Sequence, residues 1–460
     1  MRSYDKIIIP GLLLGLFLSI FQNYIWMFLV VITLAFIFYQ CDKKYLYFFI
    51  LLFFLTLTNT INAELRQILQ IVGFCILFYF FIKENGFNFD KYPRIPKSVM
   101  LFFLILYCAF ALSIVFSNYK NIGYEQIIRT TIFFLLIYFI YSALFYGIKI
   151  ELYLNIILIA SLIYSIYIMY NFGESGFNLI QVELNQVYRT GKDYIHPNAL
   201  TNLIVMSSLL LIPFMFDTNN KKLIILYLIL CLIALIISNS REAFVCYLGG
   251  VIFIFFKQNK KILKWIITSV MLFLLMVYIE PFAIIFQVYF RLEKVLSGRN
   301  EIISTVMQVI QKHFFVGVGP GGTKYELYKN LPYMFGSPQE RLINMHMNQL
   351  EFGHAHNFYL FLFSDMGLLG LFTSIILPVI FFRNCLSALK IYQNKNSRVS
   401  LLIIGITASG IAIFVRGMFE WSNILSYGTI TIDLPFWILF VIISYLNKRG
   451  NIELGKILFV

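Results

Sequence analysis

The sequence predicts an all-α polytopic integral membrane protein with about fourteen transmembrane helices and one large outer loop between the late helices. Three observations predict this class. The 460 residues are 60% hydrophobic and only 13% charged, whereas soluble domains carry about 25% charged residues. Apolar residues gather in repeated stretches close to the ~20 residues that cross a bilayer as a helix. The basic residues fall in the short connections between these stretches, as they do in oriented membrane proteins.

The apolar stretches are continuous rather than alternating, so backbone hydrogen bonding in lipid predicts helices and excludes a barrel. Eleven of the predicted spans lie within residues 1–280 and three within residues 357–460. Their cores are 7–21, 24–40, 45–60, 66–82, 98–117, 130–148, 152–171, 199–216, 222–238, 243–257, 262–280, 357–382, 400–417 and 427–447.

The basic connections all fall on one side of the membrane if the spans alternate, and both termini fall there too. The positive-inside rule makes this the cytoplasmic side. It also accounts for the net charge of +14 without nucleic acid as a partner. The connections are Lys43–Lys44, Lys83 to Lys97, Lys149, Lys221–Lys222, Lys257 to Lys264, Arg383 to Arg398 and Lys448–Arg449.

The outer side receives the two longest connections, residues 172–198 and 281–356. Within the second, apolar residues recur at helical spacing, which predicts an amphipathic helix over 298–314 that lies in the outer membrane interface. A glycine run from Gly317 to Gly322 ends this helix. All five histidines fall on the outer side: His196, His313, His346, His354 and His356.

The span 357–382 begins with the most informative motif in the chain. His356-Asn357 is followed, after nine residues, by Gly367-Leu368-Leu369-Gly370. A neutral imidazole at the outer end of a span can act as a general base toward a hydroxyl group. The alternative is an interfacial histidine that hydrogen-bonds a loop carbonyl. The two glycines allow another helix to approach closely, as in ordinary helix packing.

The pair His354 and His356 also invites a metal-site interpretation. No acidic or cysteine partner lies near them at a spacing typical of metal ligands. The six cysteines lie in or beside apolar spans with no paired spacing. We therefore predict no metal site, no disulfide framework and no cofactor.

Two arginines on the outer side, Arg241 and Arg299, are placed to bind an anion. Arg241 stands in a tight polar turn between two spans, where a partly desolvated guanidinium suits phosphate oxygens. Arg299 opens the predicted amphipathic helix, whose N-terminus attracts negative charge. The alternatives are a snorkelling anchor or a local pair with Glu242 for Arg241, and a lipid-headgroup contact for Arg299.

The glycine run lacks the Gly-Lys-Ser/Thr order of a phosphate loop, since Gly321-Gly322-Thr323-Lys324 has that order reversed. It predicts a flexible turn or a backbone nest for pyrophosphate.

Three further outer residues, Arg416, Glu420 and Trp421, cluster near the last hairpin. An arginine and a carboxylate four residues apart either pair on one helix face or contact a bound substrate. Asp365 and Asp433 lie inside apolar spans, where ionisable groups are functional candidates, are protonated, or lie close enough to the surface to reach water.

These motifs together resemble the O-antigen ligase and polymerase superfamily of bacterial surface-polysaccharide enzymes. The resemblance covers roughly residues 190–380 and rests on the order and spacing of its parts. The parts are Ser240-Arg241, Gly298-Arg299, Gly317-Val318-Gly319, and His356-Asn357 followed by Gly367-Leu368-Leu369-Gly370.

The resemblance implies a glycosyltransferase of the bacterial inner membrane, with both termini cytoplasmic and the active site facing the periplasm. Such an enzyme moves a glycan from undecaprenyl pyrophosphate to a sugar hydroxyl, with inversion and without metal or nucleotide sugar. It implies His356 as the catalytic base and Arg241 and Arg299 at the pyrophosphate. We expect Asn357, His354, Arg416 and Glu420 as further substrate contacts. The expected partners are the undecaprenyl-linked oligosaccharide, membrane lipids and a chain-length regulator protein.

Within this superfamily the sequence favours a polymerase, because its 50 phenylalanines and 30 tyrosines resemble the composition of O-antigen and capsule polymerases. The alternative is a ligase, which transfers the finished glycan to lipid A–core or to a protein hydroxyl. A transporter of the same lipid-linked units is the third reading. It is disfavoured because the two halves of the chain are unlike and the polar chemistry gathers outside rather than at the midplane.

Overall fold

The computed structural model describes residues 43–56, 63–86, 92–174, 180–183, 186–189, 197–217, 220–238, 240–276, 279, 299–330, 354–393 and 396–450. The helices are α3 (Lys43–Thr56), α4 (Ala63–Asn85), α5 (Lys97–Phe116), α6 (Lys120–Phe145), α7 (Ile150–Glu174), α8 (Pro197–Leu211), the 3-10 helix η2 (Ile212–Phe216), α9 (Lys221–Ser238), α10 (Arg241–Gln258), α11 (Lys260–Met276), α13 (Arg299–Lys312), α14 (Thr323–Asn330), α16 (Phe358–Tyr392), α17 (Ser397–Arg416) and α18 (Ile430–Lys448).

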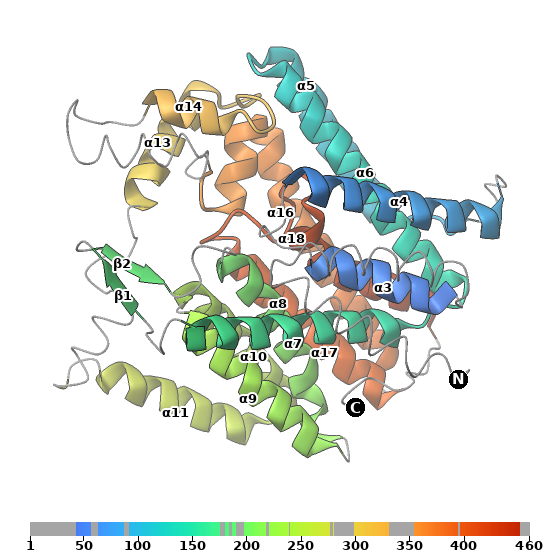
Figure 1. Ribbon diagram of the computed structural model, residues 1–460, viewed down its shortest axis with the longest axis vertical. Helices are drawn as coiled ribbons and strands as arrows, with labels where there is room; N and C mark the ends of the chain where they lie inside the picture. The colour runs from blue at the N-terminus through green and yellow to red at the C-terminus, as the bar shows by residue number, and fades with distance from the viewer. Residues whose placement is uncertain are drawn as a thin grey trace.

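The described residues are overwhelmingly helical (Figure 1), as the apolar stretches predict. Twelve of the predicted spans coincide with helices, and the spans 7–21 and 24–40 lie outside the described residues. Within the described part of the chain, seven helices are long and apolar enough to cross a membrane: α5, α6, α7, α9, α16, α17 and α18. The predicted total of about fourteen spans therefore stays a prediction.

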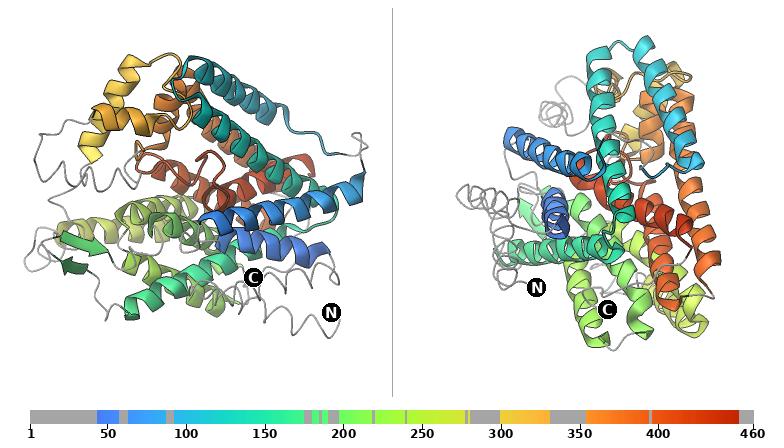
Figure 2. Two further views of the ribbon diagram at one scale, coloured as in Figure 1. Left: turned by 45° about the horizontal axis from the view of Figure 1, so that its top comes forward. Right: turned by 90° about the vertical axis from the view of Figure 1, so that its right-hand side faces the viewer.

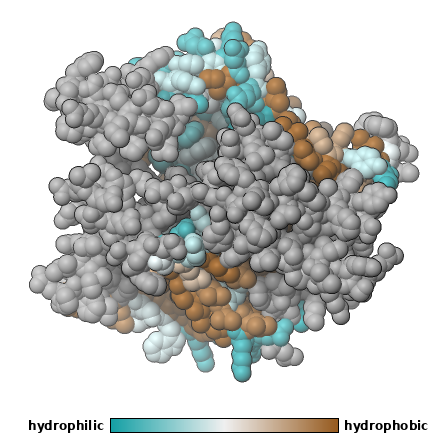
Figure 3. All heavy atoms as spheres, in the orientation of Figure 1, coloured by the Kyte–Doolittle hydropathy of each residue, from teal (hydrophilic) through white to brown (hydrophobic). Residues whose placement is uncertain are grey.

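Helices α17 and α18 form the centre of the bundle. In their most apolar stretches, 72% of the residues of α17 and 78% of those of α18 are buried, against 39% in α5 and in α9. Helix α17 packs between α8, α10 and α16, while α18 packs on α6 and α16. The exposed side chains of α5 and α9 are largely hydrophobic. Figure 3 shows such side chains gathered on the described surface, as expected of a surface that faces lipid.

The predicted amphipathic segment 298–314 coincides with α13, but its apolar face has a different partner from the one expected. Ile302, Val306, Val309 and Ile310 are buried, and α13 packs against α14 and α16 (Figure 2). Protein therefore covers these four side chains, and the position of α13 in the outer membrane interface stays a prediction.

The two predicted outer connections are described only in part. The first contains a short antiparallel hairpin of β1 (Ile180–Glu183) and β2 (Gln186–Arg189), in which Ile180 pairs with Arg189. In the second, the structure describes α13, α14 and the residues from His354 onward. Residues 281–298 and 331–353 lie outside the described part.

Candidate functional site

His356 lies in a short segment just before α16, and its imidazole faces a carboxylate. Its Nδ1 lies 3.6 Å from Oε1 of Glu420, in the loop of residues 417–429 that joins α17 to α18. The Glu420 side chain is 3% exposed and that of His356 is 20% exposed. One ring nitrogen is thus turned toward a buried acid, while the imidazole keeps access to the surface.

Asn357 ties this segment to the 417–429 loop. Its side-chain oxygen caps α16 by accepting a hydrogen bond from the Leu360 amide, and its Nδ2 donates to the carbonyl of Met418 at 3.0 Å. The next amide, of Phe358, donates to the carbonyl of Gly417 at 2.7 Å. Because the cap fixes the first turn of α16, these contacts hold His356 and Glu420 against each other.

His354 is stacked on Trp421, with 3.8 Å between ring centroids. Burial lowers the pKa of His354 to about 3, and the charges of His356 and Lys324 act in the same direction. The His354 imidazole therefore stays neutral at ordinary pH, and it offers the site an aromatic face and polar ring atoms rather than a positive charge.

Arg416 ends α17 and is 2% exposed. One of its terminal nitrogens lies 3.6 Å from Oε1 of Glu242, in the first turn of α10. Sequence spacing offered local pairs as alternatives to substrate contact, Arg416 with Glu420 and Arg241 with Glu242. The structure records two pairs between elements, Arg416 with Glu242 and Glu420 with His356.

Arg241 is the first residue of α10, directly before Glu242, and Ser240 is the N-cap. The pair between Glu242 and Arg416 therefore brings the start of α10 beside the end of α17, next to the His356 segment. Arg299 is the first residue of α13, but its side chain lies outside the described residues. The structure thus groups His354, His356, Asn357, Arg416 and Glu420, has Arg241 next to this group, and leaves the Arg299 guanidinium untested.

The glycine run does not present an open nest. The amides of Gly321 and Thr323 each donate to the Asp365 carboxylate at 2.9 Å, and the Gly319 amide donates to the Asp365 carbonyl at 2.9 Å. These donors of the glycine loop, residues 317–322 with the adjoining Thr323, are occupied by an internal carboxylate. The prediction that they cradle pyrophosphate therefore has no support here.

Asp365 and Gly367 form a sharp break inside α16. Gly367 has φ 62° and ψ −153°, and a Cβ there would lie 2.3 Å from the carbonyl oxygen of Phe315. The close approach that the glycines predicted is therefore made by the backbone before the glycine loop, not by another helix. Tyr427 donates to Asp365, and burial together with the charge of Asp365 raises the pKa of Tyr427 well above 10, so the phenol remains a donor.

Both acidic residues of the apolar spans have structural partners. Besides the contacts of Asp365, the Asp433 carboxylate accepts from the amide and hydroxyl of Ser426 at 2.7 and 2.6 Å. The two aspartates therefore fasten the glycine loop and the 417–429 loop to α16 and α18. Sequence reasoning missed Tyr427 and Ser426, since neither stands in a recognisable motif.

Backbone strain marks the same region. Among the described residues, the non-glycine residues with positive φ are His356 (44°), Asn423 (78°) and Tyr427 (52°). All three lie in the His356 segment or the 417–429 loop. Positive φ is uncommon outside glycine, although His and Asn adopt it more readily than Tyr does. Such conformations gather at functional sites, which supports these two segments as the candidate site.

Comparison with known protein families finds a match over about a third of the chain. Residues 226–375 match the family model described as O-Antigen ligase. This match supports the O-antigen ligase and polymerase superfamily, which the motifs resemble. A search of curated proteins finds no match.

The matched segment runs from within α9 to within α16, so it contains Arg241, Arg299, the glycine loop and His356. Arg416 and Glu420 lie beyond it. Their association with this segment rests on the contacts to Glu242 and His356. The match supports an enzyme of glycan transfer, and these residues are the candidates for its site.

Proposed function

We propose that the protein is an O-antigen or capsular polysaccharide polymerase that joins undecaprenyl-pyrophosphate-linked repeat units on the outer face of the bacterial inner membrane. An acceptor sugar hydroxyl attacks the anomeric carbon of the donor glycan. The bond from that carbon to the pyrophosphate oxygen breaks, and undecaprenyl pyrophosphate leaves with the electron pair. The hydroxyl proton passes to His356, and the configuration at the anomeric carbon inverts.

His356 is the general base in this proposal, and Glu420 orients it. The neutral imidazole carries its proton on Nδ1, toward Glu420, and presents the unprotonated Nε2 to the acceptor hydroxyl. The carboxylate then stabilises the imidazolium as the proton arrives. The 3.6 Å separation is slightly longer than a hydrogen bond, and such contacts tighten when substrate binds. General-base help of this kind contributes a factor of ~10²–10⁴, with positioning of the two sugars supplying much of the rest.

Arg241 and Arg299 bind the pyrophosphate in this proposal. Each begins a helix, so the helix N-terminus adds positive potential to the guanidinium. Developing negative charge on the leaving group is stabilised more strongly in a partly desolvated cleft than in water. The proposal gives the two arginines the role of neutralising the phosphates.

The observation that carries the proposal is the contact between the buried Glu420 and His356, which lies in the segment that matches the O-Antigen ligase family model. The test is deletion of the gene followed by gel analysis of the surface polysaccharide. Lipid A–core bearing a single repeat unit is the result expected of a polymerase. Unchanged long chains would contradict any role in polymerisation or ligation.

A ligase is the second candidate, and the description of the matched family favours it. Deletion of a ligase leaves lipid A–core without any glycan while long chains accumulate on undecaprenyl pyrophosphate. The same gel, combined with extraction of lipid-linked glycans, separates the two outcomes. A chain-length regulator is a proposed partner of the polymerase only. Deletion of the regulator should therefore change the chain length if the protein is a polymerase. Loss of all outer-leaflet intermediates would instead indicate the transporter alternative.

A further inference from the structure

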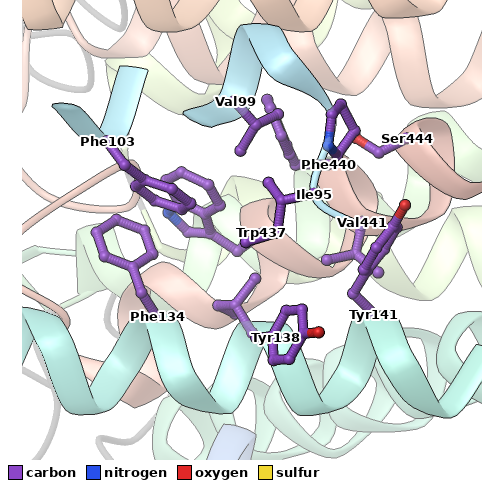
Figure 4. A pocket seen from close by; sticks show the side chains of 12 residues that line it. Ile95, Val99, Phe103, Phe134, Tyr138, Tyr141, Trp437, Phe440, Val441 and Ser444 are labelled. Carbon is purple, nitrogen blue, oxygen red and sulfur yellow. The ribbon is translucent and has the colours of Figure 1, made fainter. Parts of the chain in front are cut away.

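An apolar pocket lies between α5, α6 and α18, away from the candidate site (Figure 4). It has a volume of about 60 Å³ and is partly open to the surface. Its lining is almost entirely hydrophobic and includes Val99, Phe103, Phe134, Trp437 and Phe440. The pocket is too apolar to hold a sugar, and its shape and lining suit a hydrocarbon chain.

Two buried hydroxyl groups line this pocket without a partner among the described residues. They belong to Tyr141 of α6 and Ser444 of α18, each 5% exposed. Figure 4 shows both hydroxyls toward the same end of the pocket. Tyr138 differs, because its hydroxyl donates to the Pro93 carbonyl at 3.2 Å. A buried hydroxyl without a partner is costly, so Tyr141 and Ser444 point to a ligand that carries polar atoms at one end.

Positive charge is concentrated at that same end. The Phe145 ring packs on Tyr141 with 5.1 Å between centroids, and it lies under two cations, Lys448 Nζ at 5.1 Å and the Arg449 guanidinium at 5.4 Å. Lys448 also donates to the Arg94 carbonyl at 3.1 Å. The side chains of Arg94, Lys448 and Arg449 are exposed, so their charges are available to an anion at the pocket entrance.

We propose that this pocket binds an anionic glycerophospholipid of the leaflet opposite the candidate site. Part of one acyl chain occupies the apolar pocket, and the rest of the chain lies along the lipid-facing surface. The glycerol ester oxygens accept hydrogen bonds from Tyr141 and Ser444. The headgroup phosphate lies against Lys448, Arg449 and Arg94. Basic pockets between transmembrane helices on the cytoplasmic side favour anionic lipids in this way.

The location distinguishes this lipid from the glycan donor. The start of α18 is fastened to the candidate site through Asp433 and Ser426, whereas Ser444, Lys448 and Arg449 lie at its other end. A helix of 19 residues is about 28 Å long, so the cationic end is separated from the His356 segment by most of a bilayer. The lipid therefore holds α5 and α6 to the central helix α18 rather than taking part in the reaction.

The test measures lipid binding to the purified full-length protein by native mass spectrometry. The protein is exchanged into micelles containing either phosphatidylglycerol or phosphatidylcholine with the same acyl chains. We expect the wild type to retain phosphatidylglycerol preferentially. The double variant Lys448→Gln/Arg449→Gln should lose this preference by ~10–30-fold, because each cation near an anionic lipid contributes about fivefold.

Two further variants separate the pocket from the general basic surface. Lys221→Gln/Lys222→Gln removes two exposed cations at the start of α9 and should leave the preference unchanged. Ser444→Leu puts a side chain into the pocket and should reduce retention of either lipid while the protein still elutes as a single species. Equal retention of both lipids by the wild type would overturn the proposal. An equal loss of preference in the two double variants would also overturn it. Full retention of both lipids by Ser444→Leu would do the same.

Discussion

Glu420 Oε1 lies 3.6 Å from Nδ1 of His356, although the two residues stand 64 positions apart in the chain. The same carboxylate oxygen accepts a hydrogen bond from the amide of Trp421 at 3.1 Å. A buried acid held by its own backbone thus faces one nitrogen of the imidazole. This relationship supports the proposed role of His356 as a base oriented by Glu420.

Replacing Glu420 by Gln tests this relationship. We expect Glu420→Gln to slow glycan transfer by ~10²-fold, within the range for loss of general-base assistance, because the amide does not stabilise the imidazolium. The effect should fall on kcat rather than on the KM for the lipid-linked donor. Glu420→Asp should recover part of the rate. The measurement is transfer by purified protein with a lipid-linked donor, and the exposed Glu125→Gln on α6 serves as the matched control. A change in KM alone would show that Glu420 contacts substrate instead.

Arg241 is expected to depend on the shape of its guanidinium as well as on its charge. We expect Arg241→Ala to abolish long-chain polysaccharide and Arg241→Lys to leave a weak residual activity, because an ammonium lacks the planar fork that binds phosphate oxygens. Surface polysaccharide from a complemented deletion strain provides the measurement. Arg398→Ala, which removes a half-exposed arginine paired with Asp217, should be silent. If both Arg241 variants keep normal activity, the phosphate role of Arg241 is wrong.

Gly367 should tolerate no side chain. We expect Gly367→Ala to lower the unfolding temperature of the detergent-solubilised protein, because its φ of 62° is strained for alanine and the new Cβ would meet the Phe315 carbonyl. Gly249→Ala, at a helical position of α10 with nothing within 4 Å, should be neutral or slightly stabilising by about 0.5–1 kcal/mol. Equal unfolding temperatures for the two variants would contradict the break in α16.

His354 should make stability depend on pH. The pKa of its imidazole falls from 6.5 in the unfolded chain to about 3 in the folded protein. Between these values the unfolded state binds the extra proton, so stability decreases as the pH falls from about 6.5 toward 3. His354→Phe keeps the ring stacked on Trp421 and removes the titration, so its unfolding temperature should fall less between pH 7 and pH 5. Parallel pH profiles for the two proteins would rule out this assignment.

Hydrophobicity located the helices, because a bilayer or a packed bundle requires long apolar segments whatever their partners are. The sequence did not predict the break at Gly367, since the residues around it continue the apolar helical pattern. It also did not predict which group accepts the hydrogen bonds of the glycine-loop amides. The acceptor for Gly321 and Thr323 is Asp365, more than forty positions later, and local spacing carries no information about such contacts.

The candidate site was predictable in part for a similar reason. His356 and Arg241 stand in motifs with a recognisable order, which the family match also covers. The partners of Arg416 and Glu420 depend on how α10, α16 and α17 pack. Sequence spacing suggests only pairs between neighbouring positions, whereas the packing of these helices also brings together residues that are distant in the chain.

The most direct test of the central claim is the surface polysaccharide made by a deletion strain that expresses His356→Ala. The variant should insert and accumulate as the wild type does, since His356 is partly exposed and the cap of α16 is supplied by Asn357. We predict that the strain makes no long-chain polysaccharide. Normal long chains, at a normal level of His356→Ala protein in the membrane, would contradict a catalytic role for His356.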